Sequence, residues 1–168
     1  MSGELKTNNI LWLREATLDD MILLFCWVND PIVRQSAFCV NEISLTTHKR
    51  WFAEALMNDY VRIYILQRGD LPVGQVRVEL DDEKWMIDYS IDAAWRGYGY
   101  GKQILCLLET KMENGACLVG EVKEANVASQ KIFEELGYEK YMSNNKNIKE
   151  YRKYVVYTGG DIVTALRE

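Results

Sequence analysis

The sequence has very few of the residues that build zinc sites. It contains one histidine, His48, and four cysteines, none of which form a C-x-x-C pair. Structural and catalytic zinc is held mainly by Cys and His side chains at short spacings, so we expect no metal site. A Cys/His nucleophile pair would have to use His48, and no local motif supports one. Cys26, Cys106 and Cys117 lie in apolar runs, and we expect them to be buried free thiols.

Long apolar runs and an excess of positive charge are also missing. No stretch approaches the roughly 18 consecutive apolar residues of a membrane helix, and residues 1–7 lack the apolar centre of a secretion signal. We therefore expect a cytoplasmic protein that has no membrane partner. The formal net charge is -5. Nucleic acid is not an expected partner, because its phosphates need a basic surface.

The sequence shows none of the marks of a multidomain chain. It has only two prolines, Pro31 and Pro72, and no Gly/Ser/Pro-rich linker, internal repeat or low-complexity tract. Its 168 residues, 48% of them apolar, suit one domain of ordinary size with a buried core. We predict a single domain over residues 1–168, in which the pattern does not place the tail at 158–168.

Apolar periodicity predicts alternating strands and helices. A Thr-x-x-Asp capping pattern begins at Thr17, and the helix after it should end at Asn29-Asp30-Pro31, because the residue before a proline avoids helical angles. Residues 32–43 look irregular, and Thr46 or Thr47 is expected to cap a second helix. Strands are predicted at 10–15, 61–67, 73–80, 85–91, 116–123, 138–143 and 151–157, and later helices at 102–113 and 127–136.

This order predicts a mixed α/β sheet in which one helix joins two parallel strands, at 85–91 and 116–123. The loop between the first of these strands and the helix is rich in glycine, with the sequence Arg-Gly-Tyr-Gly-Tyr-Gly-Lys over residues 96–102. Glycines let backbone N–H groups approach a ligand, and N–H groups at a helix N-terminus attract anions. Arg96 and Lys102 add positive charge, so the loop predicts a diphosphate site.

Three kinds of diphosphate loop compete for this segment. A P-loop needs Ser or Thr after its lysine, whereas Gln103 follows Lys102. A Rossmann loop needs G-x-G-x-x-G near the first strand, which is neither the spacing nor the place found here. The pattern R/Q-x-x-G-x-G/A fits as Arg96, Gly99 and Gly101. The loop by itself does not exclude a glycine-rich turn that binds no ligand.

A second motif stands about 30 residues downstream, as Asn126-Val-Ala-Ser129-Gln-Lys-Ile-Phe133-Glu-Glu-Leu-Gly137-Tyr138. It resembles the N-x-x-A/S-x-x-x-(Tyr/Phe)-x-x-x-G-(Phe/Tyr) segment of the GCN5-related N-acetyltransferases (GNAT). The same residues also read as a capped amphipathic helix that ends at Gly137, and both interpretations can hold. With the glycine loop in the expected order, the resemblance covers residues 11–157.

The resemblance implies an α/β GNAT fold, with a mixed sheet of six to seven strands, about four flanking helices and central parallel strands that splay apart. It implies that acetyl-CoA is the co-substrate and that its pantetheine arm lies in the gap between those strands. By carry-over, acetyl-CoA contacts are expected at Ile91, Asp92, Ala93, Arg96, Gly97, Tyr98, Gly99, Tyr100, Gly101, Lys102, Asn126, Ser129 and Phe133.

The resemblance further implies direct attack of a neutral amine on the thioester, helped by a general base. Two proton carriers that are common in the family are missing. Phe133 stands at the position of the acidic tyrosine, and Met86 at the position of the basic glutamate. Alternation along the strand puts Asp88 and Ser90 on the face of Met86, which makes Asp88 the first candidate base.

Weaker candidates complete the catalytic set. Glu79 and Glu121 are further candidate bases, and each can equally be an exposed or structurally paired carboxylate. Tyr138 and Tyr141 are candidate acids, although nothing local separates them from packed tyrosines.

The N-terminal half usually forms the acceptor pocket in this family. Segments that begin at Asn29 and His48 resemble the branch that acetylates nucleotide-linked amino sugars for pseudaminic-acid-type glycans, as do the strand at 74–77 and Phe133. We therefore expect a small-molecule amine acceptor, and substrate contacts from Asn29, Arg34, His48 and Trp51. The alternative is that His48 and Trp51 only pack their helix and that Asn29-Asp30-Pro31 is only a helix stop.

Two other functions stay open at this point. One is an N-terminal acetyltransferase of proteins or peptides, of the ribosomal-protein alanine type, whose H-x-x-W-F segment is similar. The other is a non-catalytic acyl-CoA binder, because the usual Tyr and Glu are missing. A homodimer is considered as well.

Overall fold

The structure, a computed structural model, describes residues 10–158 and 161–162. Seven strands of this described part form one sheet in the order β1-β2-β3-β4-β5-β7-β6. All neighbouring strands are antiparallel except β4 and β5, which are parallel. The strands are β1 (Leu11–Glu15), β2 (Val61–Arg68), β3 (Leu71–Asp81), β4 (Lys84–Ile91), β5 (Cys117–Lys123), β6 (Glu139–Tyr141) and β7 (Ile148–Tyr154). The mixed α/β sheet is thereby confirmed.

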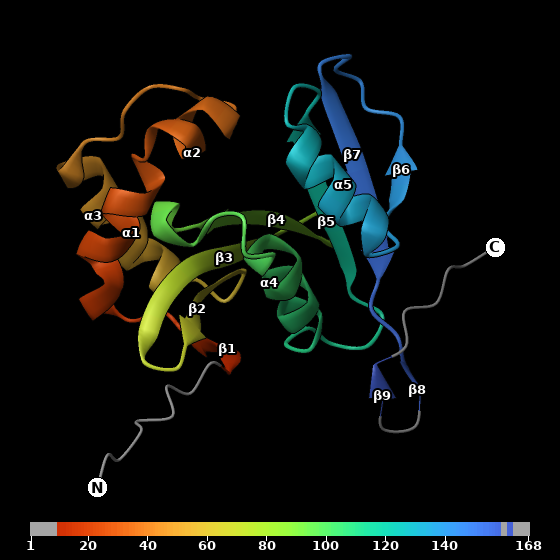
Figure 1. Cartoon of the computed structure of the whole chain (residues 1–168), viewed down its shortest axis with the longest axis horizontal. Coiled ribbons are helices and arrows are strands. Elements are labelled where there is room, and N and C mark those ends of the chain that lie inside the picture. The colour runs from red at the N-terminus through yellow and green to blue at the C-terminus, as the bar shows by residue number, and fades with distance from the viewer. Residues whose placement is uncertain (1–9, 159–160, 163–168) are drawn as a thin grey trace, which may run out of the picture.

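Five α-helices flank this sheet in the described residues. They are α1 (Met21–Val28), α2 (Pro31–Ser36), α3 (Leu45–Leu56), α4 (Tyr100–Glu109) and α5 (Val127–Glu135). Two 3-10 turns, η1 (Leu18–Asp20) and η2 (Ala93–Trp95), precede α1 and the glycine loop. Figure 1 shows α1–α3 beside β1–β4, α5 beside β5–β7, and α4 between the two groups.

The two faces of the sheet bury different cores, and β2 shows why. Its alternate residues Ile63 and Ile65 pack with the apolar residues of α1 and α3, whereas Tyr64 and Leu66 pack with those of α4. Successive side chains of a strand point to opposite faces, so one continuous apolar strand serves both cores. The helices are thus held on both sides of one sheet.

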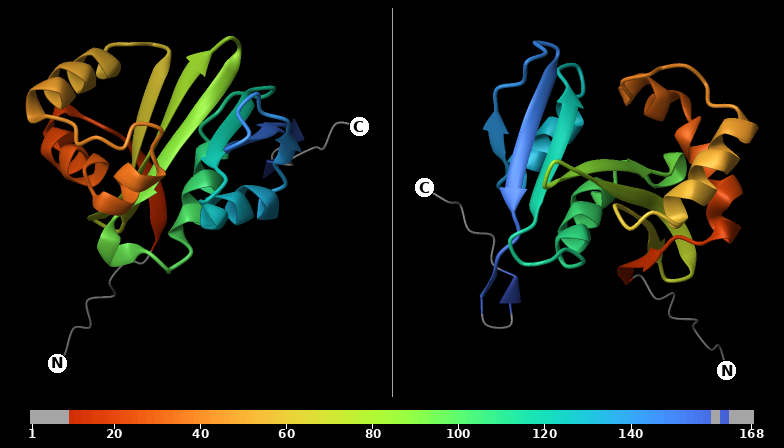
Figure 2. Two further views of the ribbon diagram at one scale, coloured as in Figure 1. Left: turned by 90° about the horizontal axis from the view of Figure 1, so that it is seen from above. Right: turned by 180° about the vertical axis from the view of Figure 1, so that it is seen from behind.

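The central parallel strands pair only at their beginnings. Residues 84–87 of β4 pair with residues 117–120 of β5, and the last pair is Ile87 with Gly120. Both strands continue beyond this pair but no longer pair with each other, and Figure 2 shows them diverging. The splay implied by the resemblance is confirmed, and it opens a gap that is lined by strand backbone.

The segment at 32–43 corrects one prediction. It is not irregular throughout, because Pro31 begins the short helix α2 and its N-cap Asp30 accepts hydrogen bonds from the N–H groups of Ile32 and Val33. Proline has the right φ for the first helical position and needs no N–H there. Asn29-Asp30-Pro31 thus ends one helix and starts another, which raises the expected four helices to five.

Several boundaries also differ from prediction. Helix α3 is capped by Ser44, whose hydroxyl accepts from Thr47 N–H at 3.2 Å, rather than by Thr46 or Thr47. Helix α4 begins and ends earlier than 102–113, and β7 starts three residues before position 151. These shifts are of the size that end fraying and unrecognised caps produce. The cap at Thr17 is confirmed, because its N–H donates to Asp20 at 2.8 Å.

The cysteines and the C-terminal segment complete the description. Cys117 is buried as expected and Cys106 is partly buried, but Cys26 is exposed, because it lies on the outer face of α1. The backbone at 157–158 pairs with that at 161–162 as a two-stranded sheet, β8 (Tyr157–Thr158) with β9 (Asp161–Ile162). The rest of the predicted tail at 158–168 lies outside the described residues.

Candidate active site

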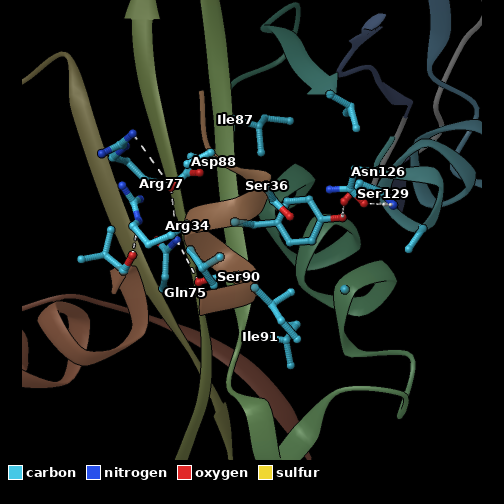
Figure 3. A pocket seen from close by; sticks show the side chains of 18 of the residues that line it. Arg34, Ser36, Gln75, Arg77, Ile87, Asp88, Ser90, Ile91, Asn126 and Ser129 are labelled. Carbon is cyan, nitrogen blue, oxygen red and sulfur yellow. Dashed lines mark hydrogen bonds and ion pairs between the residues drawn. The ribbon is translucent and has the colours of Figure 1, made fainter. Parts of the chain in front are cut away.

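A cavity of about 790 Å³ extends from the glycine loop through the gap between β4 and β5 to the space enclosed by α1, α2 and α3. Figure 3 shows side chains of β3, β4 and α5 around it. Its glycine-loop half is lined by Tyr89, Ile91, Trp95, Arg96, Gly97, Gly99, Tyr100, Gly101, Asn126, Ala128, Ser129, Ile132 and Phe133. Its N-terminal half is lined by Leu24, Val28, Ile32, Val33, Arg34, Ser36, Ala37, Ile43, Thr47, His48, Trp51, Ile63, Gln75, Arg77, Asp88 and Ser90.

The glycine loop ends in an uncapped helix N-terminus. Gly99 is the N-cap of α4 with a φ of 78°, and Gly97 has a φ of 84°. Both angles lie in the left-handed region, which other residues adopt only at a cost. Because no side chain caps α4, the N–H groups of its first turn stay available to an anion in the cavity. This is the arrangement that a diphosphate requires.

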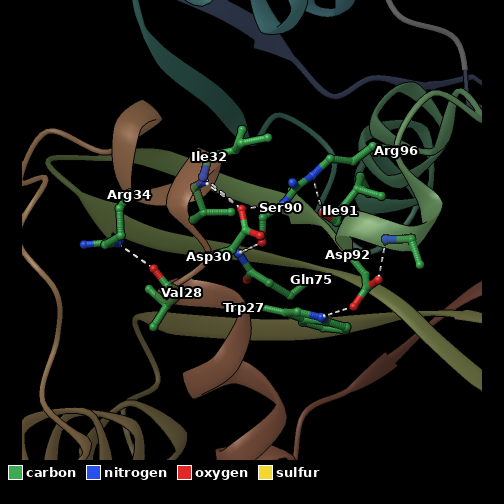
Figure 4. A network of polar contacts seen from close by, with 12 residues as sticks. Trp27, Val28, Asp30, Ile32, Arg34, Gln75, Ser90, Ile91, Asp92 and Arg96 are labelled. Atoms are coloured by element: carbon green, nitrogen blue, oxygen red, sulfur yellow. Dashed lines mark hydrogen bonds and ion pairs between the residues drawn. The ribbon is translucent and has the colours of Figure 1, made fainter.

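Arg96 joins the glycine loop to α2. Its Nη2 donates to Asp30 Oδ1 at 2.7 Å and its Nε donates to the Ile91 carbonyl at 3.1 Å (Figure 4). Burial opposes the charge of Asp30, but the hydrogen bonds from Arg96 and from the N–H groups of α2 outweigh it and lower the pKa of Asp30. The same aspartate therefore caps the helix and anchors the loop.

Asp92 makes a second link, from the segment before the glycine loop to α1. Its carboxylate accepts from Trp27 Nε1 at 2.7 Å and from the Ala94 N–H at 2.8 Å (Figure 4). Asp92 does not line the cavity, and its contacts instead anchor the loop. Of the other coenzyme residues predicted from the sequence, three also lie outside the lining: Ala93, Tyr98 and Lys102.

Lys102 is the third residue of α4, and its side chain reaches α5. Its Nζ lies 3.2 Å from Glu135 Oε2, and both side chains are largely exposed. An exposed pair of this kind is weak and opens easily. Lys102 thus adds positive charge near the loop without lining the cavity.

Helix α5 presents its first turn to the gap. Asn126 is its N-cap and accepts from the Ser129 N–H at 3.2 Å. The Ser129 hydroxyl accepts from Tyr89 Oη at 3.0 Å. One turn further on, the buried Phe133 ring lies against β5, where a Cβ on Gly120 would come within 2.3 Å of it. Asn126, Ser129 and Phe133 all line the cavity, as the sequence predicts.

A row of polar side chains crosses β3 and β4 in the N-terminal half. Arg77 lies opposite Asp88, and Gln75 opposite Ser90. Arg77 Nη2 lies 3.9 Å from Asp88 Oδ2, and Gln75 Nε2 donates to the same oxygen at 3.3 Å. Ile87, Tyr89 and Ile91 pack into the core on the other face. The predicted alternation of β4 is therefore confirmed, and Asp88 is held by one hydrogen bond and one ion pair.

The three candidate carboxylates differ in whether they line the cavity. Asp88 follows the last paired residue of β4, and Glu121 follows the last paired residue of β5, and both line the cavity. Glu79 is exposed and does not line it, because it pairs with Met86 where β4 and β5 are still joined. Asp88 and Glu121 thus flank the mouth of the gap, and Glu79 does not.

Tyr138 and Tyr141 do not line the cavity. Tyr138 is buried, and its hydroxyl has no hydrogen-bond partner of normal geometry among the described residues. Burial, with the Glu109 carboxylate nearby, holds the pKa of Tyr138 well above its ordinary value. Tyr141 bonds Glu139 on the outer edge of the sheet. The positions of both tyrosines argue against a role as acid.

Three of the four predicted acceptor residues also hold structure together. Asn29 exchanges hydrogen bonds of 2.9 and 2.8 Å with the Ile43 backbone and does not line the cavity. Arg34 lines it, while its guanidinium donates to the Val28 carbonyl at 2.5 Å and the Cys39 carbonyl at 3.1 Å. These bonds fix the segment between α2 and α3.

His48 and Trp51 both line the cavity, but differently. His48 is buried, and its Nε2 lies 3.1 Å from the Met21 carbonyl. Burial lowers the pKa of His48, so the ring is neutral near pH 7. Trp51 is 36% exposed, and the Arg77 guanidinium lies 5.0 Å from its ring centre. Trp51 therefore offers an open aromatic surface, whereas His48 belongs to the packing of α3.

Sequence reasoning missed some of the lining, above all Gln75, Arg77, Tyr89 and Lys123. The predicted strands at 73–80 and 85–91 are joined by a polar turn at 81–84, which fixes which of their residues face each other. Following that register from Asp88 would have found Arg77. Tyr89 and Lys123 carry no such local signal, because the splay that exposes them forms only in the folded chain.

The described residues contain neither a helix that could span a membrane nor a cluster of metal ligands. None of the helices there is long and apolar enough to cross a membrane. No group of three or more His, Cys, Asp or Glu side chains there could hold a metal ion.

Comparison with known proteins was made by family model, by sequence and by structure. The model of the acetyltransferase (GNAT) domain matches residues 11–139. No curated protein matches the chain. A domain from Methanocaldococcus jannaschii has a TM-score of 0.76 at 22% identity, covering 87% of this chain and 99% of that one.

Two solved acetyltransferases with coenzyme A share the fold at 17% identity. The aminoglycoside acetyltransferase AAC(6')-Ib has a TM-score of 0.71 and covers 85% of this chain and 93% of that one. RimL, a ribosomal L7/L12 α-N-protein acetyltransferase, has a TM-score of 0.74 and covers 89% and 97%. Together with the match over residues 11–139, the splayed strands and the glycine loop show that this chain belongs to the GNAT acetyltransferase family and is an acetyl-CoA-dependent N-acetyltransferase.

Proposed function

We propose that this enzyme acetylates the primary amine of a nucleotide-linked amino sugar. The observation that carries the proposal is the N-terminal half of the cavity, where Arg77, Trp51 and Asp88 lie together at the mouth of the gap. A nucleotide sugar brings a diphosphate, a flat base and an amine. These need a cation, an aromatic surface and a proton acceptor, respectively.

The donor side of the proposal uses the gap and the glycine loop. The diphosphate of acetyl-CoA would lie at the N-terminus of α4, where Gly97 and Gly99 keep the backbone accessible. Beyond Ile87, the backbone groups of β4 that face β5 have no strand partner. The pantetheine amides can pair with them, and one of these N–H groups can polarise the acetyl carbonyl. Asn126 and Ser129 would contact the arm from α5.

Asp88 is the proposed general base. An alkyl amine has a pKa well above neutral and is mostly protonated at pH 7, so a proton must be removed before the nitrogen can attack. Asp88 lies at the mouth of the gap and is held there by Arg77 and Gln75. It can accept the proton directly or through a water. Glu121, on the opposite strand, is the second candidate.

The residues proposed to contact the acceptor differ in part from those expected from the sequence. Arg77 is the cation proposed to meet the acceptor diphosphate, and the open ring of Trp51 is the surface proposed for the base. Arg34 adds positive charge from α2, although its donors are engaged with backbone carbonyls. Asn29 and His48 support this half of the cavity through their contacts with backbone groups.

The relatives support amine acceptors of more than one kind. The aminoglycoside enzyme named above acts on an amino sugar, which favours a carbohydrate acceptor. The ribosomal-protein enzyme favours an N-terminal peptide instead. At such low identity neither likeness selects the acceptor, so the two are separated by experiment.

The test is a turnover assay with acetyl-CoA that follows release of the free thiol. The panel holds UDP-linked amino sugars, the same amino sugars without the nucleotide, and peptides with a free N-terminal alanine. We expect turnover with a UDP-amino sugar at a lower KM than with the free sugar. Turnover only with peptides would overturn the acceptor assignment. Tight coenzyme A binding without turnover on any amine of the panel would also overturn the acceptor assignment.

A matched pair of variants tests the role of Arg77. Arg77→Met should raise the KM for the UDP-amino sugar about tenfold or more, because a charge-assisted contact to phosphate is lost, and should leave the KM for the free sugar unchanged. Arg62→Met is the control, since Arg62 also lies over a tryptophan, Trp85, at 4.4 Å but outside the cavity. An equal change with both acceptors would show that Arg77 does not contact the nucleotide.

A further inference from the structure

The departing thiolate of coenzyme A needs a proton, and the usual donor is replaced here by Phe133. Phe133 has no acidic hydrogen to donate. Its ring is buried against Gly120 and stacks on Tyr151, with 5.5 Å between ring centres. A replacement donor must carry an acidic O–H group and must line the gap beyond the last strand pair.

Tyr89 meets both requirements. It lies two residues beyond Ile87, the last residue of β4 that pairs with β5, and it lines the cavity. Its side chain crosses from the strand to α5, where its hydroxyl lies 3.0 Å from Ser129 Oγ. Its ring meets that of Phe133 edge-on, with 6.2 Å between ring centres. The phenol thus stands beside the ring that occupies the usual tyrosine position.

Another tyrosine in the lining, Tyr100, is placed differently. It begins α4 at the glycine loop and its ring stacks on Trp95, with 6.1 Å between ring centres. That is the diphosphate end of the cavity rather than the end where β4 and β5 meet. Tyr89 is therefore the phenol nearer the last strand pair.

We propose that Tyr89 is the general acid of the acetyl transfer, and that it delivers its proton from β4 to the sulfur. The proposal rests on the acetyltransferase function but on no particular acceptor. As the C–S bond breaks, its electron pair goes to sulfur and the Tyr89 O–H proton forms the new S–H bond. The phenolate is reprotonated by water, either directly or through the Ser129 hydroxyl, which takes a proton from water as it gives one to Tyr89. The base takes one proton from the amine and Tyr89 gives one proton to the sulfur, so the products are the amide and the free thiol.

The surroundings of Tyr89 keep it in the form that an acid needs. Burial raises the pKa of its phenol, and the hydrogen bond to Ser129 offsets this only in part. The hydroxyl is therefore protonated at neutral pH, and its activity as an acid should be lost only at high pH. The Ser129 contact fixes the direction of the hydroxyl across the gap.

The test begins with Tyr89→Phe, which removes one oxygen and keeps the ring. We expect kcat to fall tenfold or more with every amine that the wild type accepts, whereas the KM for acetyl-CoA changes less than about twofold. Tyr151→Phe is the matched control. Tyr151 also packs on Phe133 and also bonds a side chain of α5, Glu134, but it does not line the cavity. Its kcat should stay within twofold of the wild type.

A second measurement separates chemistry from packing. Replacement of Tyr89 by 2,3-difluorotyrosine keeps the hydroxyl but makes the phenol more acidic. The pH–rate profile should then fall at a lower pH on its basic side, which a purely structural hydroxyl would not cause. An unmoved profile, or a Tyr89→Phe enzyme with normal kcat, would overturn the proposal.

Failure of this proposal is distinguishable from failure of the proposed function. If no amine in the panel is acetylated, the acceptor assignment fails, and slow hydrolysis of acetyl-CoA becomes the readout for Tyr89, because the same thiolate must leave. If the wild type acetylates an amine and Tyr89→Phe is equally fast over the whole pH range, only the assignment of Tyr89 is wrong.

Discussion

At the scale of single residues, the mouth of the gap is marked by two carboxylates. Asp88 and Glu121 each stand one position beyond the last pair of β4 and β5, on the same face of the sheet. A hydrogen bond from Gln75 and an ion pair with Arg77 hold Asp88, whose side chain is 59% exposed. An exposed ion pair contributes little to stability, so the charge of Asp88 can be removed without unfolding the protein.

Asp88→Asn should lower kcat about a hundredfold, because an amide cannot accept the proton that the amine must lose. The affinity for acetyl-CoA should not change. Steady-state kinetics and isothermal titration with coenzyme A measure the two quantities. Glu79→Gln is the control, since Glu79 lies on the same face outside the cavity lining. A normal kcat for Asp88→Asn would transfer the role of base to Glu121.

At the scale of elements, the N-terminus of α4 depends on loop geometry that glycine allows. Gly97 and Gly99 both have positive φ, and a Cβ built on either meets nothing within 4 Å. The space beside them is thus open, and the N–H groups of the first turn have no side-chain cap. The loop is in turn tied to α1 and α2 by the contacts of Asp92 and Arg96.

Gly99→Asp should abolish measurable binding of acetyl-CoA, because it places a negative charge at the site proposed for the diphosphate. Isothermal titration of the protein with coenzyme A measures the loss. Gly115→Asp is a matched control, since Gly115 also has positive φ, 87°, and open space around its Cβ. Both variants carry similar backbone strain, so equal loss of binding in the two would mean that strain, rather than charge at the loop, is the cause.

At the scale of the whole molecule, one buried ion pair ties the two sides of the gap together. Lys153 on β7 donates to Glu109 at the end of α4, at 2.9 and 3.0 Å, and to the Leu136 carbonyl at the end of α5, at 2.6 Å. Burial raises the pKa of Glu109, and Lys153 opposes that rise. One ammonium thus joins α4, α5 and β7, which carry both walls of the coenzyme site.

Lys153→Met should lower the free energy of unfolding by about 3 kcal/mol near neutral pH, because it leaves a buried carboxyl without its partner. The pKa of Glu109 would then rise further. A raised carboxyl pKa stabilises the fold below the unfolded pKa and loses that stabilisation as the pH rises through the folded pKa. The loss should therefore be smaller near pH 5 than near pH 7, as measured by urea denaturation at both.

Lys131→Met provides the comparison for that measurement. Lys131 lies 3.7 Å from Glu135 in an exposed pair on α5, and its removal should cost less than about 1 kcal/mol at either pH. An equally small cost for Lys153→Met would show that the buried pair does not hold the two sides of the gap together.

The sequence by itself determined the order of the elements of the main sheet, the glycine loop and the faces of β4. These follow from local causes: side chains alternate along a strand, glycine alone accepts positive φ cheaply, and apolar residues repeat with the period of the helix. It missed α2, because Pro31 both follows one helix and begins the next. Cap positions were also misjudged where several Ser and Thr residues stand close together, as at residues 44–47.

The tertiary structure decided which of the candidate residues share a site. Glu79 and Asp88 are both candidate bases in the sequence, yet only Asp88 lies where β4 and β5 have separated. Tyr138 and Tyr89 are both tyrosines in apolar surroundings, yet only Tyr89 lines the cavity. The physical reason is that the gap forms from backbone pairing that stops at Ile87, and no local pattern in the sequence records where two strands distant along the chain cease to pair.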